Sequence, residues 1–396
     1  MRTLFIEERM SRIQVVPEGK SNTIYFDHAA TTSPIPEVVS LYKDVATNYF
    51  ANSSSMHRLG VENSRLLAKA REDIKRSFNV LHHDIIFTSG ATEANNLALK
   101  GYMERYASRG KHLIISNIEH PSILNTANHL AKLGYEITML PVRKDGKVYL
   151  EDLKKEIRED TILVSIMGVN NETGIIQPIN EIASFLKEFP TIAFHVDAVQ
   201  AVGKVGLPYD DIDMVTVSLH KIGGLKGTGL LIKKKNIELS PLFDGGGQED
   251  GYRSGTNDLA MAVASSVAIK EALSNIVEKR QNISNLIQPI YQYIANHLNE
   301  IEVNSSLENP YIINISLLNK KASVFAEFLS NNNIMVSTHS ACSSKLDIGS
   351  PTLLAMGRSA NSSKNSIRLS FSNLNTPEEV TRFIEVFDFG LKEIRG

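Results

Sequence analysis

The chain has 396 residues, which is long enough for a large domain and a smaller one beside it. Hydrophobic residues make up 42% of it, charged residues 22%, and the formal net charge is -2, so neither nucleic acid nor an anionic lipid surface is an expected partner. Cys342 is the only cysteine, which excludes an internal disulfide and favours a cytoplasmic protein, and no apolar run approaches the roughly 18 residues of a membrane span.

From residue 84 to residue 235, short apolar runs alternate with longer amphipathic segments. The runs have the length and the β-branched content of strands. They lie at residues 84–90, 111–117, 136–142, 161–170, 191–198, 212–220 and 229–235. Helix-like segments at 93–110 and 121–134 lie between them. This order predicts an α/β domain with a mostly parallel sheet, whose ligands should collect where strands end and helices begin.

The pattern changes at about residue 257. A long helical pattern begins there and is interrupted near Pro289, and strand-like runs at 311–318 and 365–372 and a terminal amphipathic helix follow. Residues 358–366 are rich in Ser and Asn and predict an exposed loop. This part of the chain is therefore expected to form a smaller α+β module.

Two groups of basic residues are expected at the surface. The run from Lys233 to Lys235 is interpreted as a solvated strand end rather than a binding patch. His82 and His83 lie near a predicted helix–strand turn and are interpreted as polar surface residues.

Lys221 and Asp197 each follow a predicted strand. Lys221 precedes a glycine-rich turn, where a lysine can form a Schiff base, although an ordinary surface lysine is the other interpretation. Asp197 ends an apolar strand, where a buried carboxylate needs a partner. It could pair with the protonated pyridine nitrogen of pyridoxal phosphate (PLP), or it could cap a helix.

Further polar groups follow other strands of the same predicted sheet. Ser89 to Thr92 form a strand–turn–helix junction whose free backbone N–H groups could hold a phosphate. His120 could stack on a flat cofactor ring or move protons, and the Asn171 amide could bind a phenolic oxygen. Neither a P-loop nor a dinucleotide fingerprint is present. Together these groups are the equipment for PLP chemistry.

The motifs that carry these residues occur in order along most of the chain. They include FTSGATEANNLALKG at 87–101, HVDAVQAVGK at 195–204, HKIGGLKGTG at 220–229, DGGGQEDGYRSGT at 244–256 and SACSS at 340–344. By these motifs the sequence resembles the cysteine desulfurase family, the NifS/IscS-like PLP enzymes of the class V aminotransferase group.

The resemblance implies a fold and a domain division. The fold is the aspartate aminotransferase-like one of type I PLP enzymes, an α/β architecture with a mostly parallel seven-stranded sheet. The large PLP-binding domain would span residues 24–270. The smaller α+β domain would combine residues 1–23 with 271–396 and would carry the cysteine loop.

The resemblance also implies roles for individual residues. Lys221 would hold PLP as a Schiff base, His120 would stack on its ring and assist proton transfer, and Asp197 would pair with its pyridine nitrogen. Contacts to the phenolic oxygen and to the phosphate would come from Gln200, Asn171, Ala91, Thr92, Ser218 and His220. Thr256 would reach the phosphate in a neighbouring subunit, which implies a homodimer. Arg368 would bind the substrate carboxylate, and Asn52 would line the substrate end of the site, as Asn171 also would.

Cys342 gains a catalytic role from the same resemblance. Its thiolate would take sulfur from L-cysteine as a persulfide and release L-alanine, and an acceptor protein (a scaffold or a sulfurtransferase) would receive the sulfur. The sulfur would serve iron–sulfur cluster assembly, tRNA thiolation or cofactor biosynthesis. No resident metal is expected, although Cys342 could act as a transient ligand to a cluster under assembly. The alternatives are a selenocysteine lyase, another class V PLP lyase or transaminase, or a catalytically silent binding partner.

Overall fold

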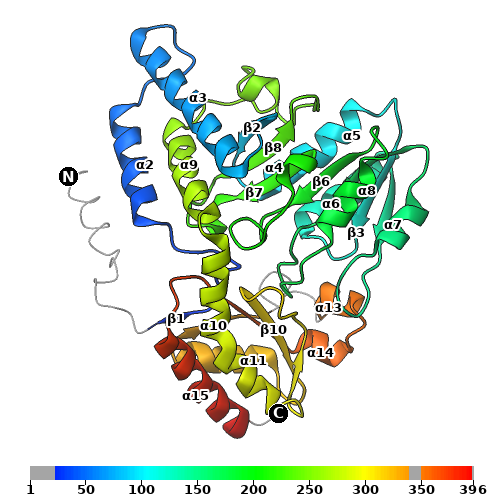
Figure 1. The fold of residues 1–396 in the computed structure, drawn as a ribbon, viewed down its shortest axis with the longest axis vertical. Coiled ribbons are helices and arrows are strands. Elements are labelled where there is room, and N and C mark those ends of the chain that lie inside the picture. Colours follow the sequence, from blue (N-terminus) through cyan, green and yellow to red (C-terminus); the bar gives the residue numbers. More distant parts are fainter. Residues whose placement is uncertain (1–22, 339–348, 395–396) are drawn as a thin grey trace, which may run out of the picture.

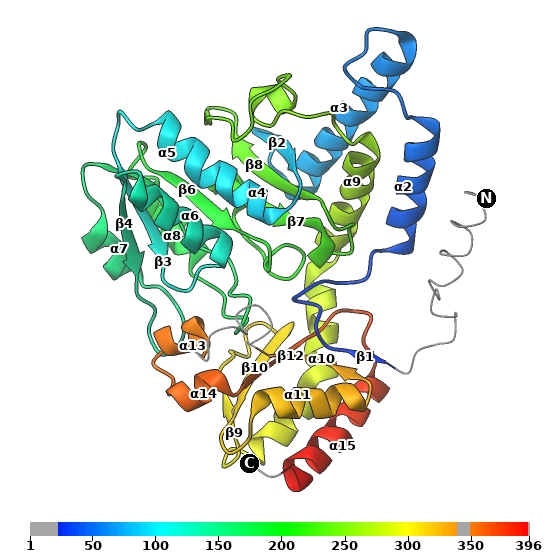
Figure 2. The same cartoon turned by 180° about the vertical axis from the view of Figure 1, so that it is seen from behind.

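The computed structural model describes residues 23–338 and 349–394. Cys342 lies outside the described residues, so the structure does not bear on its predicted role. The large sheet and its helices occupy the upper part of Figure 1, and a smaller sheet with its own helices lies below them. Figure 2 shows the same two parts of the molecule from behind.

The large sheet has seven strands in the order β2-β8-β7-β6-β5-β3-β4. They are β2 (His83–Thr88), β3 (His112–Ser116), β4 (Glu136–Leu140), β5 (Thr161–Ser165), β6 (Ala193–Asp197), β7 (Met214–Ser218) and β8 (Gly229–Lys234). Only β8 runs against its neighbours, and the pairs from β7 to β4 are parallel. The predicted α/β fold with a mostly parallel seven-stranded sheet is therefore confirmed.

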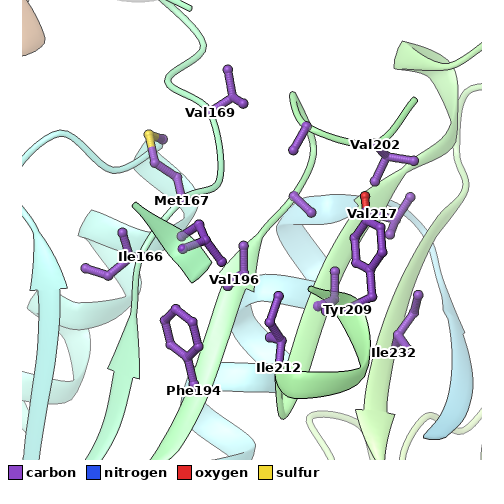
Figure 3. Close-up of a cluster of buried hydrophobic side chains, with 14 of the residues drawn as sticks. Ile166, Met167, Val169, Phe194, Val196, Val202, Tyr209, Ile212, Val217 and Ile232 are labelled. Carbon is purple, nitrogen blue, oxygen red and sulfur yellow. The ribbon is translucent and has the colours of Figure 1, made fainter. Parts of the chain in front are cut away.

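Helices cover both faces of this sheet. They are α2 (Pro36–Asn48), α3 (Arg58–Phe78), α4 (Ala91–Asn96), η1 (Leu97–Gly101), α5 (Tyr102–Arg105), α6 (Pro121–Lys132), α7 (Leu150–Glu156), α8 (Ile179–Leu186) and α9 (Leu259–Leu273). Helices α3, α7, α8 and α9 pack into the core on one face, and α4, α5 and α6 pack into the core on the other. Figure 3 shows part of the first core, with Phe194 and Val196 from β6 and Val217 from β7 among its buried side chains. Such two-sided coverage explains why the strands read as continuous apolar runs.

The smaller module contains a four-stranded antiparallel sheet in the order β12-β13-β10-β9. Its elements are β9 (Ile301–Val303), β10 (Ile312–Leu317), β12 (Ser337–Thr338), β13 (Ser366–Ser370), α10 (Ile276–Ala295), α11 (Ala322–Asn331), α13 (Pro351–Ala355), α14 (Ala360–Lys364) and α15 (Pro377–Glu393). The short strand β1 (Ile24–Tyr25) pairs with β11 (Ile334–Met335), and Ile24 and Phe26 pack into the core of this module. The first described residues thus pack against the core of the smaller module. The predicted domain boundary at residue 270 stays a proposal.

The helical pattern after residue 257 breaks at a different place from the one predicted. The break lies between α9 and α10, where Asn275 adopts a left-handed conformation, and α10 continues through Pro289. Pro289 removes the hydrogen bond to the carbonyl of Asn285, but Asn285 is exposed, so water can replace it. The opposite face of α10 buries Ile283, Ile287, Ile290 and Ile294, which holds the helix together.

The prediction of an exposed loop at residues 358–366 is wrong. Residues 360–364 form α14, in which Ser362 and Ser363 are buried. The Ser359 side chain caps this helix by accepting a hydrogen bond from the Ser362 N–H at 3.0 Å. The serine-rich composition of this segment reflects helix capping and hydrogen bonds to the backbone, so it is not a sign of a loop.

Two residues expected at the surface are buried. His83 is fully buried, and its Nε2 lies 3.1 Å from the Ile212 carbonyl oxygen. Lys233 is 1% exposed and pairs with Asp84 at 3.1 Å, beneath the ring of Tyr252. Both predictions failed because the loops that cover the β2–β8 edge come from distant parts of the chain.

Among the residues that the structure describes, no single helix is long and apolar enough to span a membrane. Helices α9 and α10 reach that length and composition only when taken together, with a bend of 65° between them.

Candidate active site

His120 lies where β3 turns into α6. It is the N-cap residue of α6, and Pro121 takes the first helical position, where its missing N–H costs nothing. Its Nδ1 accepts a hydrogen bond from the Ser122 N–H at 3.2 Å and lies 2.8 Å from the Ser122 hydroxyl. Because Nδ1 accepts, the neutral ring carries its proton on Nε2. Burial lowers the pKa of His120, so the neutral form is favoured.

A chain of hydrogen bonds joins His120 to Asp197 at the end of β6. The Asn95 side-chain amide, from α4, donates to the Ser122 hydroxyl and to Asp197 Oδ2, both at 2.8 Å. The Val199 N–H donates to Asp197 Oδ1 at 3.0 Å. The carboxylate is therefore held in one orientation at a buried strand end. Asn95 was not predicted as a site residue, because the sequence around it does not indicate a partner that lies 102 residues away.

Lys221 lies in the short 3-10 segment η3 (Leu219–Lys221), directly after β7. The backbone of this segment is fixed from outside: the Thr32 N–H donates to the His220 carbonyl at 2.9 Å, and Thr31 Oγ1 lies 3.1 Å from His220 Nδ1. Lys221 and Asp197 both act electrostatically on His120, one lowering and the other raising its pKa, after the larger effect of burial. An amine, a carboxylate and an imidazole thus converge from three strand ends, as the sequence predicted.

The predicted anion cradle lies at the junction of β2 and α4. Gly90, with φ of 156°, turns the chain into α4, and Gly229 of the neighbouring strand approaches it so closely that an added Cβ would lie 2.4 Å from the Gly90 carbonyl carbon. Ala91 and Thr92 begin α4, where backbone N–H groups are free for an anion. A surface depression of about 410 Å³ is lined by both Thr92 and His120. Ser218, at the end of β7, is buried.

Gln200 lies in the turn after β6 and is 2% exposed. Its Nε2 donates to the Ala29 carbonyl and its Oε1 accepts from Lys204 Nζ, both at 2.8 Å. Lys204 is also buried, at 8% exposure. Gln200 was predicted in the site from its motif, whereas Lys204, which lies in the same motif, was not.

Arg368 on β13 reaches across from the smaller module. Its Nη1 donates to the Asn171 carbonyl oxygen at 2.7 Å and its Nη2 to Asp27 Oδ1 at 2.8 Å. Its Nε is buried and has no hydrogen-bond partner among the described residues. A buried donor of this kind suits a carboxylate ligand. Asp27, like Asn95 and Lys204, was not predicted from the sequence.

Two predicted site residues are exposed and have no hydrogen bond to this group among the described residues. Asn52 is on the α2–α3 connection, at the top of Figure 1, where its side chain accepts from the Ser54 N–H at 2.9 Å. Thr256 is exposed between η4 (Glu249–Gly251) and α9.

Comparisons with known proteins agree with this arrangement. Residues 24–383 match the Aminotransferase class-V family. The chain is 42% identical to a "NifS/IcsS protein homolog" of Lactobacillus delbrueckii subsp. bulgaricus, over 92% of this chain and 96% of that one. It is 38% identical to "Cysteine desulfurase IscS" of Clostridium botulinum, over 94% and 95% of the two chains.

The chain belongs to the cysteine desulfurase family. A solved "NIFS-LIKE PROTEIN" superposes on this cysteine desulfurase with a TM-score of 0.87 at 32% identity, covering 94% of this chain and all of the other. The predicted family, fold class and enzyme class are thereby confirmed. The roles of individual residues in this desulfurase stay predictions.

Proposed function

We propose that this cysteine desulfurase uses PLP to remove sulfur from L-cysteine, with Cys342 as the first sulfur acceptor and L-alanine as the product. The observation that carries the proposal is the convergence of Lys221, Asp197 and His120 from the ends of β7, β6 and β3, joined in part by the Asn95 hydrogen bonds. These residues fit PLP: a buried carboxylate suits a protonated ring nitrogen, and an amine beside it suits an aldehyde.

The cofactor would be held by residues of the large sheet's edge. Lys221 would form the Schiff base, Asp197 would accept the pyridinium proton in a hydrogen bond, and His120 would lie against the ring. The phosphate would take Ala91, Thr92, Ser218 and His220, and Gln200 and Asn171 would face the phenolic oxygen. When bound, PLP draws electrons from the substrate's carbon skeleton, which is the chemistry that side chains alone lack.

The substrate would be oriented from the smaller module. Arg368 would bind the carboxylate of L-cysteine with its buried Nε–H and an adjoining Nη–H, a bidentate geometry. His120, neutral because burial lowers its pKa and protonated on Nε2, can donate that proton and take it back. Asn52 would line the substrate end of the site.

The sulfur transfer balances without any added oxidant or reductant. The Cys342 thiolate attacks the sulfur of the substrate, an S–S bond forms, and the bond between that sulfur and the substrate β carbon breaks. The electron pair left on the carbon takes up a proton, which gives L-alanine. Cys342 then carries a persulfide, which an acceptor protein such as a scaffold or sulfurtransferase would remove for iron–sulfur assembly, tRNA thiolation or cofactor synthesis.

The working form would be a cytoplasmic homodimer. Thr256 is exposed in one chain, which supports a role at the site of the other subunit. Within each subunit, residues 24–270 would form the PLP-binding domain, and residues 1–23 with 271–396 the smaller one. The single cysteine agrees with a reducing compartment.

The decisive experiment measures alanine release from L-cysteine, with a reductant present, by wild type and by Cys342→Ala. Both proteins should show the yellow absorption of bound PLP. We expect the variant to keep this absorption and to lose at least 100-fold in alanine release, because it has no thiolate to accept sulfur. Equal release by both proteins would point instead to a lyase that needs no enzyme thiol.

A further inference from the structure

Lys204 is a buried cation of the site for which the proposed mechanism has no use. It is 8% exposed, and burial, followed by the charges of Lys221 and Arg368, lowers its pKa to about 7. A buried amine beside two other cationic groups is costly to keep. Such a residue needs either a structural or a functional reason.

The hydrogen bonds of Lys204 fix the orientation of a neighbouring amide. Its Nζ donates to Gln200 Oε1 at 2.8 Å, and Gln200 Nε2 donates to the Ala29 carbonyl at 2.8 Å. Below its pKa of about 7 the Lys204 ammonium has donors only, and a backbone carbonyl accepts only. The two ends of the Gln200 amide therefore cannot be exchanged without creating two repulsive contacts.

We propose that Lys204 is a positioning residue that makes Gln200 present an N–H, and not its oxygen, to the phenolic oxygen of PLP. The inference rests on the proposed function, in which Gln200 faces that oxygen. The Gln200 NH2 group has two hydrogens; the Ala29 carbonyl takes one, and the second serves the cofactor. A donor there stabilises the phenolic oxygen in its anionic form.

The charged groups around Lys204 come from three other elements. Lys221 lies in η3, Arg368 lies on β13 and is paired with Asp27, and His28 follows β1. Burial, with Lys204 as the next cause, lowers the pKa of His28 to about 4, so His28 is neutral. Among these described groups Lys204 is the one bonded to the Gln200 amide. Its removal therefore leaves the amide held by the Ala29 carbonyl alone, without breaking the Arg368 ion pair.

The test follows the absorption of bound PLP as the pH is raised, in wild type, Lys204→Met, Gln200→Leu and the double variant. Loss of a donor to the anionic oxygen raises the pKa of the Schiff-base proton that this oxygen shares. We expect the midpoint of the absorption change to rise by about half to one pH unit in Lys204→Met, since a typical net hydrogen bond has this size. The dissociation constant of PLP should be about three- to tenfold larger for Lys204→Met than for wild type.

The double variant separates positioning from general damage. If Lys204 acts through Gln200, Lys204→Met adds nothing to Gln200→Leu, so the double variant has the midpoint of Gln200→Leu alone. Additive shifts, or an unchanged midpoint in Lys204→Met, would overturn the inference. If Lys204→Met does not fold, Lys204→Gln replaces it: its amide can donate or accept, so it no longer forces the orientation, and the midpoint should again rise.

Lys233→Met is the matched control. Lys233 is another buried lysine, but it pairs with Asp84 at the opposite end of β8 from the site. Its loss should lower the thermal stability without moving the midpoint. Failure of the proposed function would be recognised by a different result, because wild type would then bind no PLP and show no absorption to titrate.

Discussion

Glu119 is a carboxyl group that the fold buries directly behind His120. Its Oε1 accepts from the Ser116 hydroxyl and from the Met167 N–H, so it links the ends of β3 and β5. Its Oε2 is buried without a hydrogen-bond partner among the described residues. Burial raises the pKa of Glu119 from the usual 4.5 to about 8, although both hydrogen bonds act in the opposite direction.

The raised pKa makes stability depend on pH in a defined window. Between pH 4.5 and 8 the folded state keeps a proton that the unfolded state has lost, so the free energy of unfolding falls as the pH rises through this window. Glu119→Gln has no proton to lose and should remove this part of the decline, about a few kcal/mol between pH 5 and 8. Urea unfolding at pH 5, 6.5 and 8 measures it. Glu188→Gln, at an exposed position, should keep the wild-type slope, and an equal slope in Glu119→Gln would contradict the prediction.

At the scale of single elements, Glu249 ties a loop to the sheet. Its carboxylate accepts from both Nη groups of Arg71 on α3, from the Phe87 N–H at 2.8 Å, and from the Asn257 side chain. Glu249 adopts a left-handed φ of 51°, which costs energy in a residue with a side chain. These bonds repay that cost and hold the segment that leads to Thr256.

Glu249→Gln should therefore destabilise the protein strongly. It leaves the Arg71 guanidinium, 21% exposed, beside a neutral group, and removal of one partner of a buried pair costs about 3 kcal/mol. Chemical denaturation measures the loss. Glu302→Gln is the control, because Glu302 pairs with Arg358 where both side chains are over a quarter exposed, and should cost less than about 1 kcal/mol. Similar losses in the two variants would show that Glu249 does not hold the loop.

Short-range patterns predicted the large sheet well but not every element around it. The strands and the polar groups at their ends were predictable because buried parallel strands are continuous apolar runs and their ends share one edge. Helix α14 and the straight path of α10 through Pro289 were not, since caps and tertiary packing decide them. The carboxylate partners of Asn95 and Arg71 lie more than 100 residues away in sequence, so no local pattern could reveal them.

At the scale of the whole molecule, Arg368 connects the smaller module to the site at the edge of the large sheet. It stands on β13 of the small sheet, binds the Asn171 carbonyl beyond β5 of the large sheet, and pairs with Asp27 in the segment after β1. A guanidinium can make both contacts and still offer donors to a substrate, whereas an ammonium is a single point charge. Arg368 therefore contributes to the junction of the two cores, and it is the side chain that we propose to bind the substrate carboxylate.

Arg368→Lys should raise the KM for L-cysteine at least tenfold and change kcat less, because the charge remains but the bidentate geometry is lost. Steady-state alanine release over a range of cysteine concentrations measures both constants. Arg358→Lys is the matched control: Arg358 also binds one carboxylate, one backbone carbonyl and has a buried Nε, but its partners Glu302 and Val303 lie within the smaller module. Its KM should equal that of wild type. If Arg368→Lys lowered kcat alone, Arg368 would act on the chemical step instead of binding the carboxylate. The substrate would then not bind the smaller module through this residue.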